Sequence, residues 1–60
     1  MQNRKTRILL ADDHTVVRKG FILILSGQPD LEVVGEARNG REAVELAEKL
    51  QPDVVVIDVS

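Results

Sequence analysis

Cysteine, tryptophan and tyrosine are missing from this 60-residue sequence, and Phe21 is its one aromatic residue. Without cysteine the chain can form neither a disulfide nor a thiolate metal site. A single aromatic side chain offers no platform on which bases could stack, and the net charge of −2 does not favour contact with a phosphate backbone. We therefore expect this segment to bind no nucleic acid.

Long apolar runs are missing too. The longest, Phe21–Leu25, is far too short to span a bilayer. The basic residues near the N-terminus precede an apolar stretch that Asp12 and Asp13 interrupt, which is not the pattern of a signal peptide. We expect a cytoplasmic protein with no membrane association.

The chain is short enough for its stability to need support. A domain of this size buries only about 60% of the surface that its unfolded chain exposes, and disulfides, a structural metal or oligomerisation usually compensate. With no cysteine and one histidine, His14, the remaining supports are a carboxylate-bound metal and self-association.

Three segments have the pattern of strands. Residues 6–11 form an apolar run that indicates a buried strand. Residues 31–37 alternate in part and place Glu32 and Glu36 on one face, which predicts a strand at a sheet edge. Residues 53–59 include four consecutive β-branched side chains, typical of a strand buried on both faces.

The first helix is expected over residues 15–26, with Asp13 or His14 at its N-cap and Gly27 at its end. The apolar residues at helical spacing are Val17, Phe21 and Ile24. Because residues 21–25 are apolar all round the helix, we expect at least one of Ile22 and Leu25 to face something other than the chain's own sheet.

The second helix begins after Asn39, with Glu42 three residues later as in a capping box, and ends before Pro52. Its apolar stripe comprises Ala43, Leu46, Ala47 and Leu50. Glu45 and Lys49 are spaced to form an i,i+4 ion pair. Strands that alternate with helices imply an α/β fold with a parallel sheet and right-handed crossovers.

Acidic residues follow two of the predicted strands: Asp12-Asp13 after the first, and Asp58 at the end of the third. Because carboxyl ends of parallel strands lie at one edge of the sheet, these carboxylates should converge there. A hard divalent cation relieves the repulsion between them, and Mg²⁺ keeps part of its coordination shell for phosphate. An aspartate beside such a cation can accept a phosphoryl group.

Simpler explanations exist for the same residues. Paired acids after a strand often only cap the next helix, so Asp12-Asp13 alone is weak evidence for a site. We expect His14 to be a solvated residue at the helix start and not a ligand, since one histidine without partners makes no metal site.

Three stretches together resemble the first half of a response-regulator receiver domain. They are Ile8–His14 (ILLADDH), Val33–Ala37 (VVGEA) followed by Asn39-Gly40, and Pro52–Asp58 (PDVVVID). The similarity points to regulators with a helix-turn-helix DNA-binding domain of the nitrate-regulator type. It implies that residues 1–60 are a truncated receiver domain. The implied fold is half of a flavodoxin-like fold, with a three-stranded parallel sheet in the order 2-1-3 and two helices.

The resemblance also implies a site and its partners. Asp58 would be the phosphoacceptor, and Mg²⁺ would be bound by Asp12, Asp13, Asp58 and the backbone carbonyl of Ser60. A histidine kinase would supply the phosphate, and the intact protein would be a transcription regulator and not an enzyme. A receiver continues with a hydroxyl residue ending its fourth strand and a lysine ending its fifth, and both would fall after Ser60.

Three functions therefore compete for this chain. It could be a magnesium-dependent phosphoacceptor, or a half-domain that self-associates as a homodimer or larger oligomer without phosphotransfer. The lysine and hydroxyl residue lacking from residues 1–60 favour the second. A metal-dependent phosphohydrolase is a third possibility, but it requires a second acid two residues after Asp58, where Ser60 stands.

Overall fold

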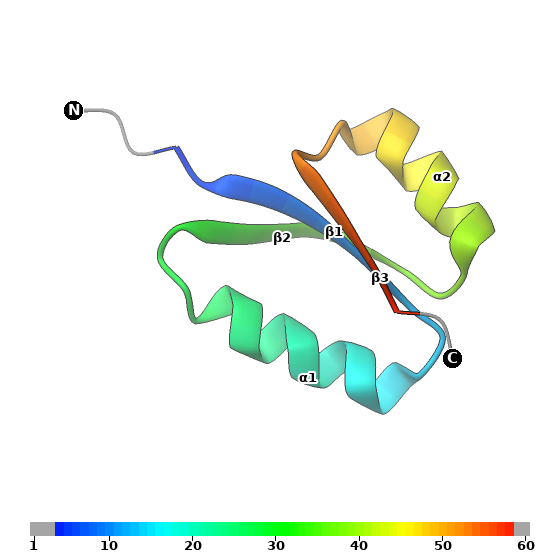
Figure 1. Ribbon diagram of the computed structural model, residues 1–60, viewed down its shortest axis with the longest axis horizontal. Helices are drawn as coiled ribbons and strands as arrows, with labels where there is room; N and C mark the ends of the chain where they lie inside the picture. Colours follow the sequence, from blue (N-terminus) through cyan, green and yellow to red (C-terminus); the bar gives the residue numbers. More distant parts are fainter. Residues whose placement is uncertain (1–3, 59–60) are drawn as a thin grey trace.

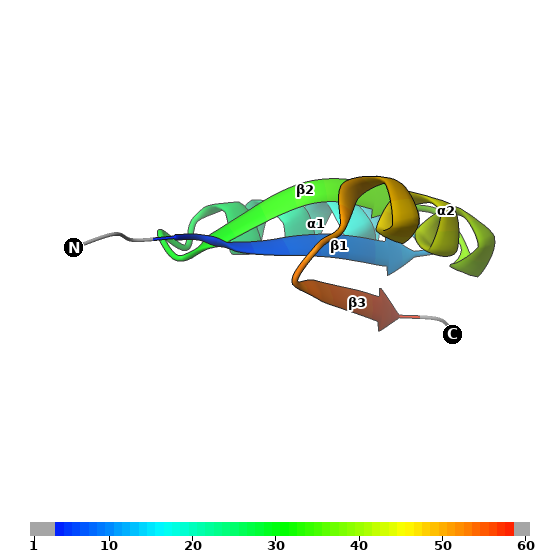
Figure 2. The same cartoon turned by 90° about the horizontal axis from the view of Figure 1, so that it is seen from above.

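The computed structural model describes residues 4–58 and contains the five predicted elements in the predicted order (Figure 1). Their bounds are β1 Thr6–Asp12, α1 Thr15–Ser26, β2 Leu31–Ala37, α2 Gly40–Leu50 and β3 Val54–Asp58. The strands pair in parallel in the order β2-β1-β3 (Figure 2). The expected α/β class, the strand order and the two helices are confirmed. Val59 and Ser60 lie outside the described residues.

The two helices cover opposite faces of the sheet (Figure 1). A Cβ added to Gly35 of β2 would lie 2.7 Å from Leu50 Cδ1, so Gly35 faces α2. The next residue, Glu36, accepts a hydrogen bond from Arg18 of α1. Alternate residues of a strand point to opposite faces, which accounts for this division.

β1 is the central strand and forms most of the core. Ile8, Leu9, Leu10 and Ala11 are each at most 5% exposed. On the α2 side, Ala11 packs with Ala37 and Ala43, and Leu46 lies against them. These small side chains let α2 approach the sheet closely at the end of β1 where the site lies.

The sheet-facing side of α1 differs from the prediction. Ile22 and Leu25 are half-buried and Arg18 is buried, so these three residues form the inward stripe. Val17, Phe21 and Ile24 are 40–64% exposed. The expectation that Ile22 or Leu25 would face away was therefore wrong.

β2 is an edge strand, as its glutamates predicted, but it carries an irregularity. Ile8 pairs with Val33 whereas Leu9 pairs with Gly35, so the register shifts by one residue at Val34. A one-residue shift exchanges the two faces of a strand. Glu32 and Glu36 consequently lie on opposite faces, contrary to the prediction that they share one.

β3 is exposed, not buried on both faces as its sequence suggested. Its four apolar residues are 40–55% exposed. The strand pairs only with β1 among the described residues, and α1 packs against β1 and β2 but not β3. The apolar run of β3 is thus solvent-accessible in the chain of residues 4–58.

The start of α2 matches its predicted cap. Asn39 Oδ1 accepts a hydrogen bond from the Glu42 backbone N–H at 2.9 Å, and the Glu42 carboxylate accepts one from the Arg38 N–H. The predicted stripe of Ala43, Leu46, Ala47 and Leu50 is buried or half-buried. Arg38 and Glu42 form the i,i+4 ion pair at this helix, and the predicted Glu45–Lys49 pair is not among the ion pairs of residues 4–58.

Neither described helix has the length and apolar character needed to cross a membrane.

Candidate functional site

The last residue of β1, Asp12, is a buried carboxylate, with its side chain 0% exposed. Its Oδ1 accepts a hydrogen bond from the His14 backbone N–H at 2.8 Å. Its Oδ2 is buried and has no hydrogen-bond partner among the described residues. Burying an unsatisfied carboxylate oxygen is costly, so this atom marks a place suited to a cation or a donor.

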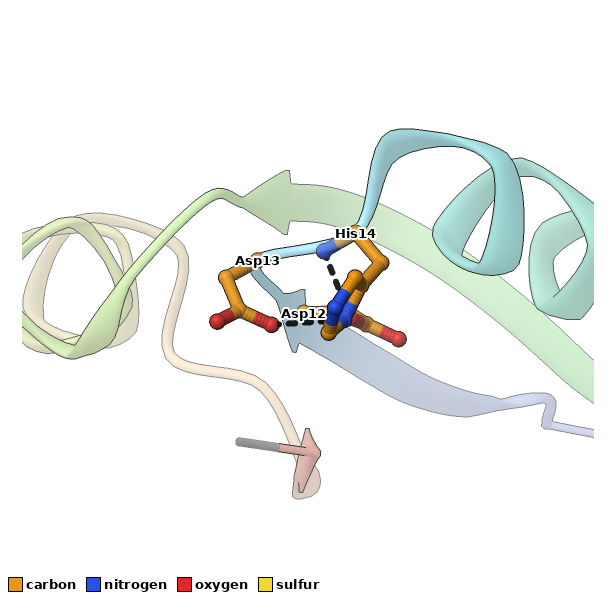
Figure 3. A group of neighbouring side chains, drawn as sticks. All are labelled: Asp12, Asp13 and His14. Atoms are coloured by element: carbon orange, nitrogen blue, oxygen red, sulfur yellow. Dashed lines mark hydrogen bonds and ion pairs between the residues drawn. The ribbon is translucent and has the colours of Figure 1, made fainter. Parts of the chain in front are cut away.

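Asp13 and His14 lie in the turn between β1 and α1, beside Asp12 (Figure 3). His14 Nδ1 is 2.9 Å from Asp13 Oδ1 and 3.5 Å from Asp12 Oδ1. One potential metal-ligating atom from each of the three residues lies within 4.8 Å of the others. His14 occupies the N-cap position of α1, one of the two residues predicted there, but its side chain makes no capping hydrogen bond. The imidazole is directed to the carboxylates instead.

Asp58 ends β3 beside Asp12. The two are register partners in the parallel pair of β1 and β3, so they share one face at the carboxyl edge of the sheet. Asp58 is exposed, and the group of three gathered side chains does not include it. Ser60, the fourth predicted ligand, lies outside the described residues.

Arg18 connects the acidic turn to the rest of the fold. Its side chain is 8% exposed; one nitrogen donates to the Asp12 backbone oxygen and Nε donates to Glu36 Oε1, both at 2.8 Å. Lys19 Nζ donates to both Glu36 oxygens at 3.1 Å. The hydrogen bonds from Arg18, and then from Lys19, lower the pKa of Glu36. The end of β1 is therefore held to α1 and β2 by one buried guanidinium.

The site residues fit a hard divalent cation. Asp12 and Asp13 supply carboxylate oxygens, the ligands that Mg²⁺ prefers, and Asp12 Oδ2 is buried without a donor. Sequence reasoning named both acids but treated His14 as a solvated residue and overlooked Arg18. The sequence pattern does not distinguish a basic residue that points inward at the fourth position of a helix from one that is exposed to solvent.

Residues 8–60 match the response regulator receiver domain family. The chain belongs to this family. It is 53% identical over 53 residues to the transcriptional regulatory protein LiaR of Bacillus subtilis and 49% identical over 53 residues to the nitrate/nitrite response regulator NarL of Escherichia coli. Each match covers 88% of this chain, and 25% and 24% of the respective relative.

The receiver family includes proteins with other outputs. The chain is 48% identical over 59 residues to a protein-glutamate methylesterase/protein-glutamine glutaminase of Pyrococcus abyssi, a match that covers 98% of this chain and 16% of that protein. The chain thus spans about a quarter or less of the length of these curated relatives. Its residues match receivers of both transcription regulators and methylesterases.

Solved receiver domains share the fold. The receiver of the putative response regulator NarL from Mycobacterium tuberculosis superimposes with a TM-score of 0.88 at 40% identity, over 92% of this chain and 44% of that chain. The response regulator domain of Thermotoga maritima CheB gives a TM-score of 0.84 at 46% identity, over 87% of this chain and 39% of that chain. The predicted receiver identity and half-flavodoxin-like fold are confirmed.

Proposed function

We propose that this receiver module accepts a phosphoryl group on Asp58, with Mg²⁺ held by Asp12 and Asp13. The observation that carries the proposal is the position of Asp58, which is the register partner of Asp12 at the carboxyl edge of the sheet. Asp12 is buried, and its Oδ2 has no hydrogen-bond partner among the described residues. Ligands of open α/β sheets bind at this edge. An oxygen of Asp58 and the carbonyl of Ser60 are the proposed further ligands.

In the proposed reaction, a carboxylate oxygen of Asp58 attacks the phosphorus of a phosphohistidine. The phosphorus–nitrogen bond breaks, the leaving imidazole takes a proton from solvent water, and an acyl phosphate forms on Asp58. Bound Mg²⁺ would offset the negative charge on the phosphoryl oxygens. The exposure of Asp58 leaves it accessible to a donor, and Arg18 holds the backbone of Asp12 in place for the cation.

The natural phosphodonor is proposed to be a histidine kinase, in the cytoplasm. Similarity to LiaR and NarL supports a transcription regulator as the whole protein, with DNA bound by another domain and not by this segment. The chain would act as a phosphoacceptor and not as an enzyme. We propose no membrane partner for this segment.

Mass spectrometry after incubation with acetyl phosphate and Mg²⁺ tests the phosphoacceptor. We expect one added phosphoryl group on the wild-type chain and on Asp30→Asn, an exposed acid away from the site, but none on Asp58→Asn. Phosphorylation of Asp58→Asn at the wild-type level would contradict the assignment. For the cation, amide shifts on Mg²⁺ titration should be largest at residues 12, 13 and 58, and a uniform response would argue against the site.

Self-association is a second candidate function of the 60-residue chain. It is favoured by the exposure of the apolar side chains of β3 together with Leu23 and Ile24 of α1, which are 76% and 64% exposed. Exposed apolar surface of this kind often marks an interface. Self-association does not require phosphotransfer, so an experiment that rules out one of the two functions does not rule out the other.

A further inference from the structure

We infer that Arg18 is a positioning residue of the proposed phosphoacceptor site, and that its side chain sets the affinity of the site for Mg²⁺ without touching the cation. The inference rests on the proposed function, because it takes Asp12 and Asp13 as the ligands of the cation. Three observations carry it: the hydrogen bonds that close the turn after β1, the burial of the guanidinium, and its second acceptor on β2.

The turn between β1 and α1 is closed by three hydrogen bonds of 2.8 Å each. The His14 N–H donates to Asp12 Oδ1, the Arg18 N–H donates to the His14 carbonyl, and Arg18 Nη1 donates to the Asp12 backbone oxygen. Asp12 and Arg18 are thus linked both through His14 and directly. The orientation of the Asp12 carboxylate therefore depends on the position of Arg18.

The guanidinium reaches the backbone of Asp12 and leaves the carboxylate of that residue to other partners. The ionic partner of Arg18 is Glu36, and the ion pairs of residues 4–58 include none between Arg18 and Asp12. Arg18 can therefore orient the carboxylate without competing with a cation for its oxygens.

Glu36 of β2 holds the other edge of the guanidinium. Arg18 Nε donates to Glu36 Oε1 at 2.8 Å, and Lys19 Nζ donates to both oxygens of Glu36 at 3.1 Å. The side chain of Arg18 is 8% exposed, so it has little room to leave its two acceptors. One planar group that donates to two strands, β1 and β2, is a geometry that lysine cannot reproduce.

Hydrogen bonds behind the ligands commonly determine how well a metal site binds. Outer partners orient the ligands, and losing one typically costs about 10–100-fold in metal affinity or activity. For Asp12, the outer partner is the Arg18 guanidinium, which is fixed at a second point by Glu36. A change at Arg18 should consequently be felt at the site although Arg18 contacts no ligand oxygen.

Magnesium titration of the 60-residue chain, followed through the amide shifts of residues 12, 13 and 58, tests the inference. Arg18→Met should weaken Mg²⁺ binding by about tenfold or more. Arg18→Lys should restore part of this loss, because one ammonium group can reach one of the two acceptors. Each titration is made at a temperature at which circular dichroism shows the variant to be folded.

Leu25→Ala is the matched control for a loss of stability. Leu25 is half-buried on the same inward stripe of α1 but lies two turns from Arg18, so the change weakens the packing of the helix without removing a hydrogen bond at Asp12. Its Mg²⁺ affinity should stay close to the wild-type value. Equal losses of Mg²⁺ affinity in Arg18→Met and Leu25→Ala would overturn the inference and leave the magnesium site standing.

The reaction with acetyl phosphate separates positioning from a loss of fold. Arg18→Met should need about tenfold more Mg²⁺ to reach its half-maximal rate, whereas its rate at saturating Mg²⁺ should remain near the wild-type rate because Asp58 is unchanged. A rate that falls equally at every Mg²⁺ concentration would contradict a role in binding the cation.

Hydrogen exchange without metal reports on the turn itself. The His14 amide donates to Asp12 Oδ1 and should exchange faster in Arg18→Met than in Leu25→Ala. Unchanged exchange of this amide in Arg18→Met would show that the turn keeps its geometry without Arg18, which overturns the inference. A wild-type chain that binds no Mg²⁺ would instead overturn the proposed magnesium site, and the inference with it.

Discussion

Arg18 illustrates how a single buried side chain supports the acidic end of β1. Replacing it with methionine keeps much of the apolar stem but removes the donors to the Asp12 backbone oxygen and to Glu36. A hydrogen bond to a charged group is worth about 1.5–3 kcal/mol, and Glu36 keeps its hydrogen bonds from Lys19. We therefore expect the free energy of unfolding to fall by about 2–3 kcal/mol, close to the value of one such bond. Urea denaturation followed by circular dichroism measures the change.

Lys19 provides the matched control, since it binds the same Glu36 from a side chain that is 59% exposed. Exposed ion pairs contribute about 0–1 kcal/mol, so Lys19→Met should have an effect in that range. Equal losses for Arg18→Met and Lys19→Met would show that the burial of Arg18 contributes nothing.

Glu36 should make the free energy of unfolding depend on pH in the acid range. Its pKa is lowered in the folded state, first by the hydrogen bond from Arg18 and then by that from Lys19. A carboxyl group with a lowered folded-state pKa stabilises the fold above its unfolded-state value, and the contribution disappears as the pH falls through the folded-state value. Stability should therefore decline below pH 4.5, the ordinary value for this carboxyl group.

Urea midpoints measured across this acid range test the assignment. Glu36→Gln should flatten the decline, whereas Lys19→Met should keep most of it because the Arg18 hydrogen bond remains. An unchanged acid profile in Glu36→Gln would mean that other carboxyl groups produce the dependence.

The sequence revealed the acids of the site but not the residues around them. Asp12, Asp13 and Asp58 could be recognised because each follows a strand pattern, and parallel strands bring such positions to one edge. Arg18 could not, because hydrophobic periodicity assigns charged residues to the solvent side of a helix. The contact of His14 Nδ1 with Asp13 Oδ1 at 2.9 Å is likewise a tertiary detail that no sequence pattern encodes.

At the scale of the elements, the contact between β2 and α2 leaves no room for a side chain at Gly35. A Cβ there would lie 2.7 Å from Leu50 Cδ1 and 3.3 Å from Leu9 Cδ1. Leu50 is half-buried and can move somewhat, whereas Leu9 is fully buried. Gly35→Ala should lower the free energy of unfolding by about 1–2 kcal/mol, as moderate overpacking does.

Gly20 of α1 is the matched control, because a Cβ there meets nothing within 4 Å. Alanine is favoured over glycine in a helix by about 0.8–1.0 kcal/mol, so Gly20→Ala should stabilise the chain. Thermal unfolding of both variants gives the two signs. A stabilising Gly35→Ala would show that α2 is free to shift away from the sheet.

The type of each element could be predicted from the local sequence pattern, but which side chains of β2 and α1 point inward could not. The pattern of β2 was read with a strict alternation, and the register shift at Val34 moved Glu36 to the α1 side. In α1, apolar residues cover both sides of the helix, so periodicity could not distinguish the stripe at Ile22 and Leu25 from the one at Phe21 and Ile24. Both outcomes are tertiary features, and they meet in the hydrogen bond from Arg18 of α1 to Glu36 of β2.

At the scale of the whole molecule, the reactivity of Asp58 should depend on groups outside residues 1–60. The resemblance to receivers implies that a lysine and a hydroxyl residue, on strands other than β1, β2 and β3, stabilise the phosphoryl oxygens. Losing electrostatic stabilisation of this kind costs about 10²–10³ in rate. The 60-residue chain should thus react with acetyl phosphate more slowly, by about that factor, than a complete receiver of the same type. Comparable rates under identical conditions would show that the acidic edge alone supports the reaction.

The 60-residue chain should also form a homodimer or larger assembly. The outer edge of β3 has no strand partner within residues 4–58, and a free apolar edge is a template for another chain. An antiparallel pairing of two β3 strands would build one six-stranded sheet with the acidic edges at opposite ends. Burying about 500 Å² of apolar surface per chain would contribute about 12 kcal/mol before the costs of association.

Size-exclusion chromatography with light scattering at micromolar concentration decides the oligomeric state. Val55→Lys places a charge in the β3 edge, and because dimer contacts and fold support each other, it should dissociate and unfold the chain together. Val44→Lys makes the same chemical change at a 61% exposed position of α2, outside β3, and should leave the assembly intact. A wild-type monomer with a native amide spectrum would contradict the prediction, because it would show that β1 and the two helices stabilise the sheet without any cover on β3.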